Sequence, residues 1–296
     1  MPEVRFEIGY LPLALDLALG KLRIETLPGL GVKIAEVEAS KQVHKSWFYA
    51  PPQMASNWNV LEARPYPSRI FGMPKTHLLL FERSEEAARA EFLIWVLSFI
   101  KGVRLTPTEM GFVDATPIRL GALVDFRVRS KDVPEALSKA DEYWSNQSSK
   151  NNNCDLFCAA VHALFMSQNP RLLQFEQFGL LYTALDTCFA LVKGSRSSKE
   201  HIPHSKRFSW VCAQLEIRVP SWADSYLSDI RNPLVHEAVF IGKSMGFAIH
   251  ASDTEPEINL QMHALACRIL VAEIFGASVE YVGSQVDTRQ IMRLSL

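Results

Sequence analysis

The sequence lacks a surplus of charge of either sign. Its 296 residues carry 31 Lys and Arg against 32 Asp and Glu, which gives a net charge of −1. A protein that coats nucleic acid along a whole face usually has a clear basic excess. Any contact that this chain makes with nucleic acid must therefore be local.

Long apolar runs are also lacking, and so is the pattern of a secretory leader. The longest apolar run, residues 92–100, includes Ser98 and is less than half the length that a helix needs to cross a bilayer. Glu3, Arg5 and Glu7 interrupt the start of the chain, where a signal peptide would have its apolar segment. The sequence predicts a protein that does not use a membrane as a partner.

Cysteine is scarce, and its number is odd. The 5 cysteines all lie in apolar, helix-like segments, which favours reduced core thiols in a cytoplasmic protein over a disulfide framework. Cys154, Cys158 and His162 are spaced four apart, as metal ligands on one helical face would be. Their apolar neighbours and the lack of a fourth ligand favour core packing instead. We therefore expect no metal and no cofactor, and no Gly-rich phosphate loop or nucleophile elbow is present.

The first 130 residues predict a mixed α/β domain. Residues 4–8 alternate like a half-buried strand, and residues 32–37 predict a second strand after the turn at Pro28 and Gly29. Residues 47–74 carry five prolines, which favours irregular structure or edge strands. Further elements are expected at residues 77–81 and 120–128, both strands, and between Ser84 and Gly102, a helix with Glu85 and Glu86 in its first turn.

The remainder, residues 131–296, predicts an all-α bundle with one small inserted hairpin. The polar residues 145–153 predict a surface loop, and the turn at residues 242–246 predicts a hairpin between residues 239–241 and 247–249. Helices are expected from Asn169-Pro170 to Gly194, over residues 206–219, after the capping pair Ser221 and Asp224, and over residues 259–275 before Gly276. The fold class predicted for the whole chain is therefore α+β, with domains at residues 1–130 and 131–296.

Residues 229–237, which read Asp-Ile-Arg-Asn-Pro-Leu-Val-His-Glu, are the most informative part of the sequence. Asn232 followed by Pro233 is a cap-and-start signal, so we predict a helix that begins within this run, with His236 in its first turn or just beyond. Backbone N–H groups at such an end attract phosphate, and Arg231 would add a permanently charged clamp. An Arg that holds phosphate beside a His that exchanges protons near pH 7 suits phosphodiester cleavage.

Spacing alone does not single this pair out, because Arg196 and His201 repeat it in a polar, Ser-rich loop. The context does separate the two pairs. Arg231 is followed at once by the polar Asn232, a Leu-Val step precedes His236, and the run lies at a helix junction.

On this run and on the order of the helices around it, about residues 135–296 resemble the HEPN superfamily, and its ApeA-like branch in particular. That family is marked by Arg, a polar residue, a short gap and His on a compact helical bundle. The resemblance implies a metal-independent endoribonuclease in a toxin–antitoxin or antiviral defence system. It also implies RNA as substrate, a homodimer that joins two copies of the motif, and a cognate inhibitor or sensor ligand as a further partner. The catalytic residues would be Arg231, His236 and Asn232.

The chemistry of the run adds a mechanism for single-stranded RNA. With no metal-activated water and no Ser or Cys nucleophile in evidence, the substrate's own 2′-hydroxyl is the expected attacking group. His236 would remove its proton, and Arg231 would stabilise the charge that grows on the phosphate.

Other readings of the same residues stay open. Some HEPN proteins have lost activity and only bind nucleotide, RNA or a protein partner. Arg231 could pair with Asp229 or Glu237, with His236 as a buried core imidazole. The basic residues of the loop region could form an RNA backbone track or a solvated loop; they are Lys193, Arg196, Lys199, Lys206 and Arg207. The amino-terminal domain would suit a sensing or targeting module, by analogy alone.

Overall fold

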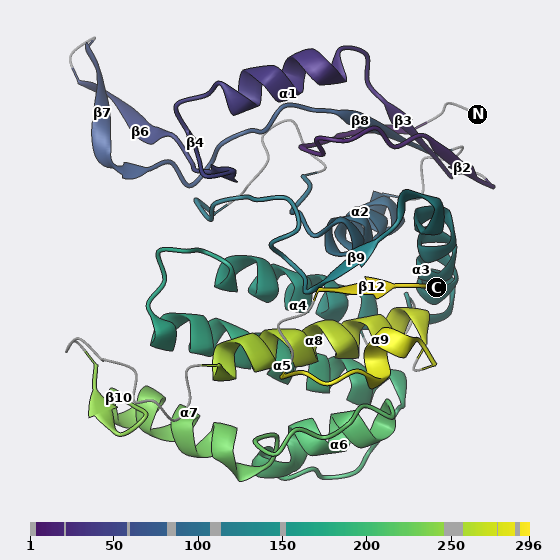
Figure 1. The fold of residues 1–296 in the computed structure, drawn as a ribbon, viewed down its shortest axis with the longest axis vertical. Helices are drawn as coiled ribbons and strands as arrows, with labels where there is room; N and C mark the ends of the chain where they lie inside the picture. Colours follow the sequence, from purple (N-terminus) through teal and green to yellow (C-terminus); the bar gives the residue numbers. More distant parts are fainter. Residues whose placement is uncertain are drawn as a thin grey trace. The chain divides into compact units, whose positions relative to one another are not determined.

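The structure is a computed structural model of mixed α and β content, with a small sheet in the amino-terminal part and helices in the carboxy-terminal part. It describes residues 4–20, 22–57, 60–81, 87–106, 114–148, 152–245, 257–276, 278–287 and 291–296. The chain forms two compact units (Figure 1), of which the first comprises Met1–Leu123, Ser130–Asp141 and Gln168–Pro170. The second comprises Val124–Arg129, Glu142–Ser167 and Arg171–Leu296.

The first unit is built on a four-stranded antiparallel sheet of order β1-β8-β3-β2. Its strands are β1 (Val4–Ile8), β2 (Leu17–Leu19), β3 (Leu22–Thr26) and β8 (His77–Phe81). Along β3, Leu22 and Ile24 are buried while Arg23 is exposed, which is the period of two that one covered face requires. The strands predicted at residues 4–8 and 77–81 are confirmed.

η2 (Ser130–Asp132) and residues 133–141 of α3 (Val133–Gln147) also belong to this unit. Two helices and two hairpins complete it. They are α1 (Leu30–Glu38), α2 (Ala87–Lys101), the hairpin of β4 (Val43–His44) with β5 (Trp47–Phe48), and the hairpin of β6 (Pro52–Asn57) with β7 (Val60–Pro67). Gly102, at φ 67°, follows α2 as expected, whereas the predicted start of that helix at Ser84 lies outside the described residues. The proline-rich segment forms β6 and β7, and both strands of a two-stranded sheet are edges, as predicted.

The strand predicted at residues 32–37 is wrong, because this segment lies in α1. Gly29 precedes the helix in the left-handed region, at φ 78°, and its freedom from a Cβ allows that turn. Leu30, Ile34 and Val37 then recur at helical spacing on the less exposed side, while Val32 is 63% exposed. The apolar residues therefore follow a period of 3.6 rather than 2.

The second unit is organised around three long helices: α4 (Asn153–Ser167), α5 (Gln174–Ser195) and α8 (Ile258–Phe275). α5 packs against both α4 and α8. Among the described residues, α8 is the helix long and apolar enough to cross a membrane, and 78% of that window is buried inside the structure. A helix that is apolar on all sides and covered by its neighbours is typical of a protein core. Its predicted end at Gly276 is confirmed.

Shorter elements surround this core. They are η3 (His204–Lys206), α6 (Arg207–Gln214), α7 (Ser225–Glu237), α9 (Glu280–Gly283), β9 (Phe126–Val128), β10 (Val239–Phe240), β11 (Lys243–Ser244) and β12 (Met292–Leu294). The inserted hairpin is confirmed, but its second strand is β11, so its turn is tighter than predicted. The predicted partner strand at residues 247–249 lies outside the described residues.

Several predicted boundaries in this region are wrong. α5 begins at Gln174 rather than at Pro170, because the carboxylate of Glu176 accepts a hydrogen bond from the Leu173 N–H (2.8 Å) at the start of the helix. The helix expected over residues 206–219 ends at Gln214. The strand expected at residues 120–128 is only β9, and it pairs in parallel with β12, a strand that the sequence did not predict.

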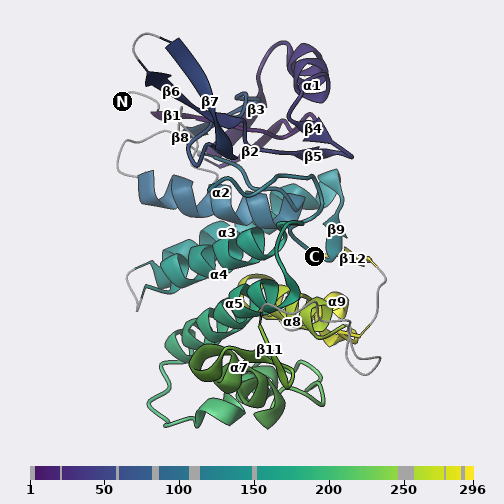
Figure 2. The ribbon, with the colours of Figure 1, turned by 90° about the vertical axis from the view of Figure 1, so that its left-hand side faces the viewer.

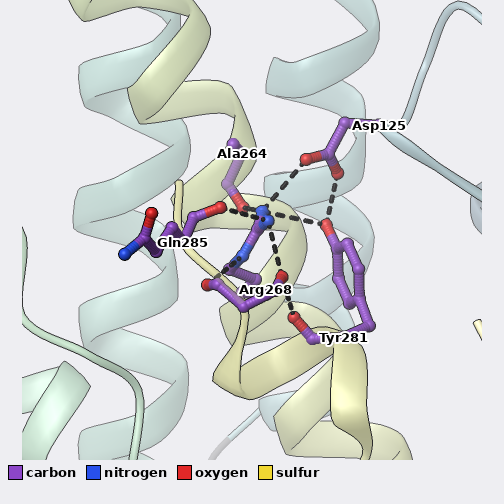
Figure 3. A network of polar contacts seen from close by, with 6 residues as sticks. Asp125, Ala264, Arg268, Tyr281 and Gln285 are labelled. Atoms are coloured by element: carbon purple, nitrogen blue, oxygen red, sulfur yellow. Dashed lines mark hydrogen bonds and ion pairs between the residues drawn. The ribbon is translucent and has the colours of Figure 1, made fainter. Parts of the chain in front are cut away.

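A buried arginine ties these late segments to the core (Figure 3). Arg268 of α8 is 1% exposed and donates to the Asp125 carboxylate (3.0 Å), which lies just before β9. Its remaining N–H groups reach carbonyl and hydroxyl oxygens of Ala264, Tyr281, Ser284 and Gln285 at 2.8 to 3.3 Å. A buried guanidinium is tolerated because every donor has an acceptor. The network holds β9, α9 and the segment after α9 to one helix.

Candidate functional site

The motif residues lie on α7, which runs without a break through the whole motif. The prediction that a helix begins at Asn232-Pro233 is therefore wrong, and Pro233 lies inside the helix. The buried side chains of Leu227 and Ile230 anchor α7 before the proline, and this packing outweighs the backbone hydrogen bond that Pro233 cannot donate. His236 is in the last turn, so the backbone N–H groups of a helix start are not available beside it.

Arg231 is half-buried on α7, and its recorded partner is the next residue. The guanidinium Nη1 donates to the side-chain oxygen of Asn232 at 3.1 Å. The structure records no ion pair of Arg231 with any other described residue, Asp229 and Glu237 included. His236 and Asn232 are exposed. The structure therefore does not agree with the alternative in which an acid neutralises Arg231 and His236 is a buried core residue.

Arg231 and His236 do not point the same way. Two side chains five residues apart on an α-helix leave it in directions that differ by about 140°. One α7 helix therefore presents the two groups on different sides. A single active site that uses both needs the substrate to wrap the helix or a second copy of the chain.

The charge of Arg231 acts on Tyr182 and His204. These residues belong to a group of polar side chains from neighbouring elements, here called the α5–α7 cluster: Tyr182, Asp186, His204, Arg207 and Arg231. Tyr182 and Asp186 come from α5, His204 from η3 and Arg207 from α6. The rings of Tyr182 and His204 stack at 6.0 Å with 12° between their planes, and the Tyr182 hydroxyl lies 3.0 Å from His204 Nδ1. The Arg207 guanidinium pairs with the Asp186 carboxylate at 2.6 Å.

The charges of the cluster act on its two aromatic members. Burial lowers the pKa of His204, and the charges of Arg207 and Arg231 lower it further, while Asp186 opposes them. Burial raises the pKa of Tyr182, as does Asp186, against the effects of Ser228, Arg231 and Arg207. The charges of Arg207 and Arg231 therefore oppose a positive charge on His204. Such a group of residues can receive an anion.

The five basic residues that could have formed an RNA track are mostly paired. Arg196 lies 3.6 Å from the buried Glu273 carboxylate, Lys206 lies 3.0 Å from Asp224, and Arg207 pairs with Asp186. Lys193 lies over the Phe189 ring at 5.9 Å, and Lys199 is exposed. These pairs compensate much of the positive charge. Only Arg207 joins the cluster that contains Arg231.

Sequence reasoning gave no role to Tyr182, Asp186 or His204. A signal was present, since Tyr182 and Asp186 are four residues apart and must share one face of a helix. No local pattern indicates that this face lies against His204, because that contact depends on how η3 packs against α5 and α7.

The cysteines and histidines do not form a metal centre among the described residues. No group of three or more His, Cys, Asp or Glu side chains in this part of the chain is arranged to hold a metal ion. All five cysteines are free thiols. Burial, and to a lesser degree Asp155, raises the pKa of Cys154 on α4 to about 12, as expected for a core thiol.

Comparisons with protein-family models, with curated proteins and with solved structures found no match.

Proposed function

We propose that the protein is a metal-independent endoribonuclease of the HEPN type that cleaves single-stranded RNA. The observation that carries the proposal is the state of the motif on α7. Among the described residues, the hydrogen bond that Arg231 makes goes to the neutral Asn232, and His236 is exposed, so both groups can reach a substrate. Asp186, the carboxylate of the cluster, is paired with Arg207 and not with Arg231. An arginine with a structural role would be expected to pair with a carboxylate, as Arg268 does with Asp125.

Each residue has a defined part in the proposed reaction. His236 removes the proton of the 2′-hydroxyl, whose oxygen then attacks the adjacent phosphorus. Arg231 stabilises the charge on the phosphate oxygens, and Asn232 orients its guanidinium. The bond from phosphorus to the 5′-oxygen breaks and this oxygen takes up a proton from solvent, while His236 releases the proton it took back to solvent. The products are a 2′,3′-cyclic phosphate and a free 5′-hydroxyl.

A second candidate function is a silent module that binds RNA, nucleotide or a protein partner without cleaving it. The divergence of Arg231 and His236 on α7 favours this candidate if the protein works as a single chain. In the active candidate, two copies of the chain face one groove, so that a histidine from one copy serves the arginine of the other.

The two candidates are separated by incubating the full chain with a labelled single-stranded oligoribonucleotide and a matched oligodeoxyribonucleotide, both in excess EDTA. We expect cleavage of the RNA only. His236→Ala should abolish turnover with little loss of RNA affinity, whereas Arg231→Ala should weaken both binding and rate. His201→Ala is the matched control, because His201 has the same spacing from Arg196 and is also exposed. RNA that binds but is never cut would support the silent module instead.

A further inference from the structure

The first unit contains a cavity of about 580 Å³, within the range of small-molecule sites. Its wall is mostly apolar and comes from α1, the β4–β5 hairpin and the segments around residues 10, 73, 103 and 118; the apolar side chains include Val37, Val43, Phe48, Met73, Val103 and Ile118. Figure 2 shows the β4–β5 hairpin beside α1. An apolar wall of this extent accepts a ring system or a short chain.

Charged side chains line the same cavity, and the positive ones are in excess. Lys45 and Arg119 carry positive charge, and Glu38 carries negative charge. The structure records no ion pair between any of these three residues and another described residue. Two cations and one acid that are not neutralised by each other favour a ligand with a single negative charge.

Arg119 is held in place by the hairpin. Its guanidinium lies over the Trp47 ring at 4.6 Å, a distance at which the ring attracts a cation. Phe48 and Ile118 exchange two backbone hydrogen bonds of 2.8 and 2.9 Å, which fix the segment before Arg119 to β5. The guanidinium is thus positioned before any ligand arrives.

Lys45 lies in a turn whose backbone conformation is unfavourable for Lys and Ser. Lys45 and Ser46 form the two-residue loop of the β4–β5 hairpin, with φ angles of 48° and 64°. Loops with two positive φ angles strongly favour Asn-Gly, and bulkier residues cost free energy there. A strained loop whose two residues both line a cavity is more typical of a binding site than of a hairpin selected for stability alone.

We propose that this cavity binds a small amphipathic anion, with its apolar body among Val37, Phe48 and Met73 and its acidic group between Lys45 and Arg119. This site is independent of the motif on α7. The ligand class is one apolar ring or chain with one carboxylate, sulfonate or phosphodiester group.

The test uses 8-anilinonaphthalene-1-sulfonate, a fluorescent amphipathic monoanion, and its uncharged counterpart N-phenyl-1-naphthylamine. We expect saturable binding of the sulfonate to the full chain at one site. Arg119→Ala should weaken that binding about tenfold or more, the effect of losing one charge-assisted hydrogen bond. The uncharged probe should lose much less affinity. Lys41→Ala is the matched control, because Lys41 is exposed near the hairpin but does not line the cavity.

A second variant distinguishes loss of the binding site from loss of the fold. The double change Lys45→Asn with Ser46→Gly suits the turn, so it should raise the Tm while it weakens sulfonate binding. A more stable protein that binds the anion less tightly supports the proposal. Sulfonate affinity that is unchanged in both the Arg119 and the Lys45 variants, or reduced equally by Lys41→Ala, would overturn it, and so would the absence of saturable binding.

Discussion

Asn232 is the residue through which the structure holds the guanidinium of Arg231, by one hydrogen bond of 3.1 Å. Asn232 is exposed, so its replacement should leave the fold intact. Asn232→Ala should lower kcat several-fold, because the guanidinium loses its orientation. Asn232→Asp should be worse for RNA binding, because a carboxylate beside Arg231 competes with phosphate. Fluorescence anisotropy for Kd and a cleavage assay for kcat separate these effects. Equal activity of all three forms would remove the positioning role.

A second residue, Glu273 of α8, makes stability depend on pH. Burial raises its pKa, and this effect outweighs those of Ser195, Arg196 and the hydrogen bond from the Tyr143 hydroxyl (3.3 Å). A carboxyl group with a raised pKa in the folded state contributes stability that is present below its unfolded pKa, near 4.5, and is lost as the pH rises through the folded pKa.

Glu273→Gln should therefore raise the Tm at pH 7, and the gain should shrink as the pH falls towards 4. A gain of about 1 kcal/mol corresponds to about 2–4 °C in a protein of this size. Differential scanning fluorimetry across this pH range measures it. Glu280→Gln, at the exposed start of α9, is the control and should show no such pH-dependent gain. A lower Tm for Glu273→Gln at pH 7 would mean that its ion pair with Arg196 stabilises the fold.

At the scale of elements, the sequence predicted those whose signals are local. The alternation at residues 4–8 and the glycines Gly102 and Gly276 gave a strand and two helix ends, all confirmed. Pairings between distant segments were not predictable. β9 and β12 pair across more than 160 residues, and the hydrogen bond from Arg268 to Asp125 helps to hold β9 in place for that pairing.

The same limit explains the error at the motif. Asn232-Pro233 is a local signal for the start of a helix. The buried side chains of Leu227 and Ile230 nevertheless stabilise the turns of α7 before Pro233, so the helix begins earlier and continues past the proline. The cluster around Arg231 also depends on packing between elements that are distant in the sequence. Tyr182, His204 and Arg231 come from three elements, and no pattern within one of them reveals the contact of Tyr182 with His204 or the effect of the Arg231 charge on His204.

Pro233 provides a test of this helix. A proline inside a helix costs free energy, whereas a proline at the first helical position does not. Pro233→Ala should therefore raise the free energy of unfolding by about 1 kcal/mol or more, as the new N–H completes the hydrogen-bond ladder. Chemical denaturation measures the change, and Pro220→Ala in the loop before α7 is the control. A neutral or destabilising effect of Pro233→Ala would indicate that the helix begins at the motif after all.

At the scale of the whole molecule, the divergence of Arg231 and His236 makes the oligomer part of the mechanism. We expect a homodimer at micromolar concentration in sedimentation analysis. We also expect that an equal mixture of Arg231→Ala and His236→Ala chains regains activity. About half of the dimers would contain one chain of each kind, and each of these would keep one intact site of its two. About a quarter of the wild-type rate should therefore return. A strict monomer, or no recovery after subunit exchange, would exclude a site shared between two copies.

The most direct measurement of the central claim is the identification of the ends of the cleaved RNA by mass spectrometry. Attack by the 2′-hydroxyl predicts a 2′,3′-cyclic phosphate on one fragment and a 5′-hydroxyl on the other, with the matched DNA left intact. These products should disappear with His236→Ala and persist with His201→Ala. A 5′-phosphate end, or equal cutting of DNA, would contradict the proposed mechanism even if the protein proves to be a nuclease.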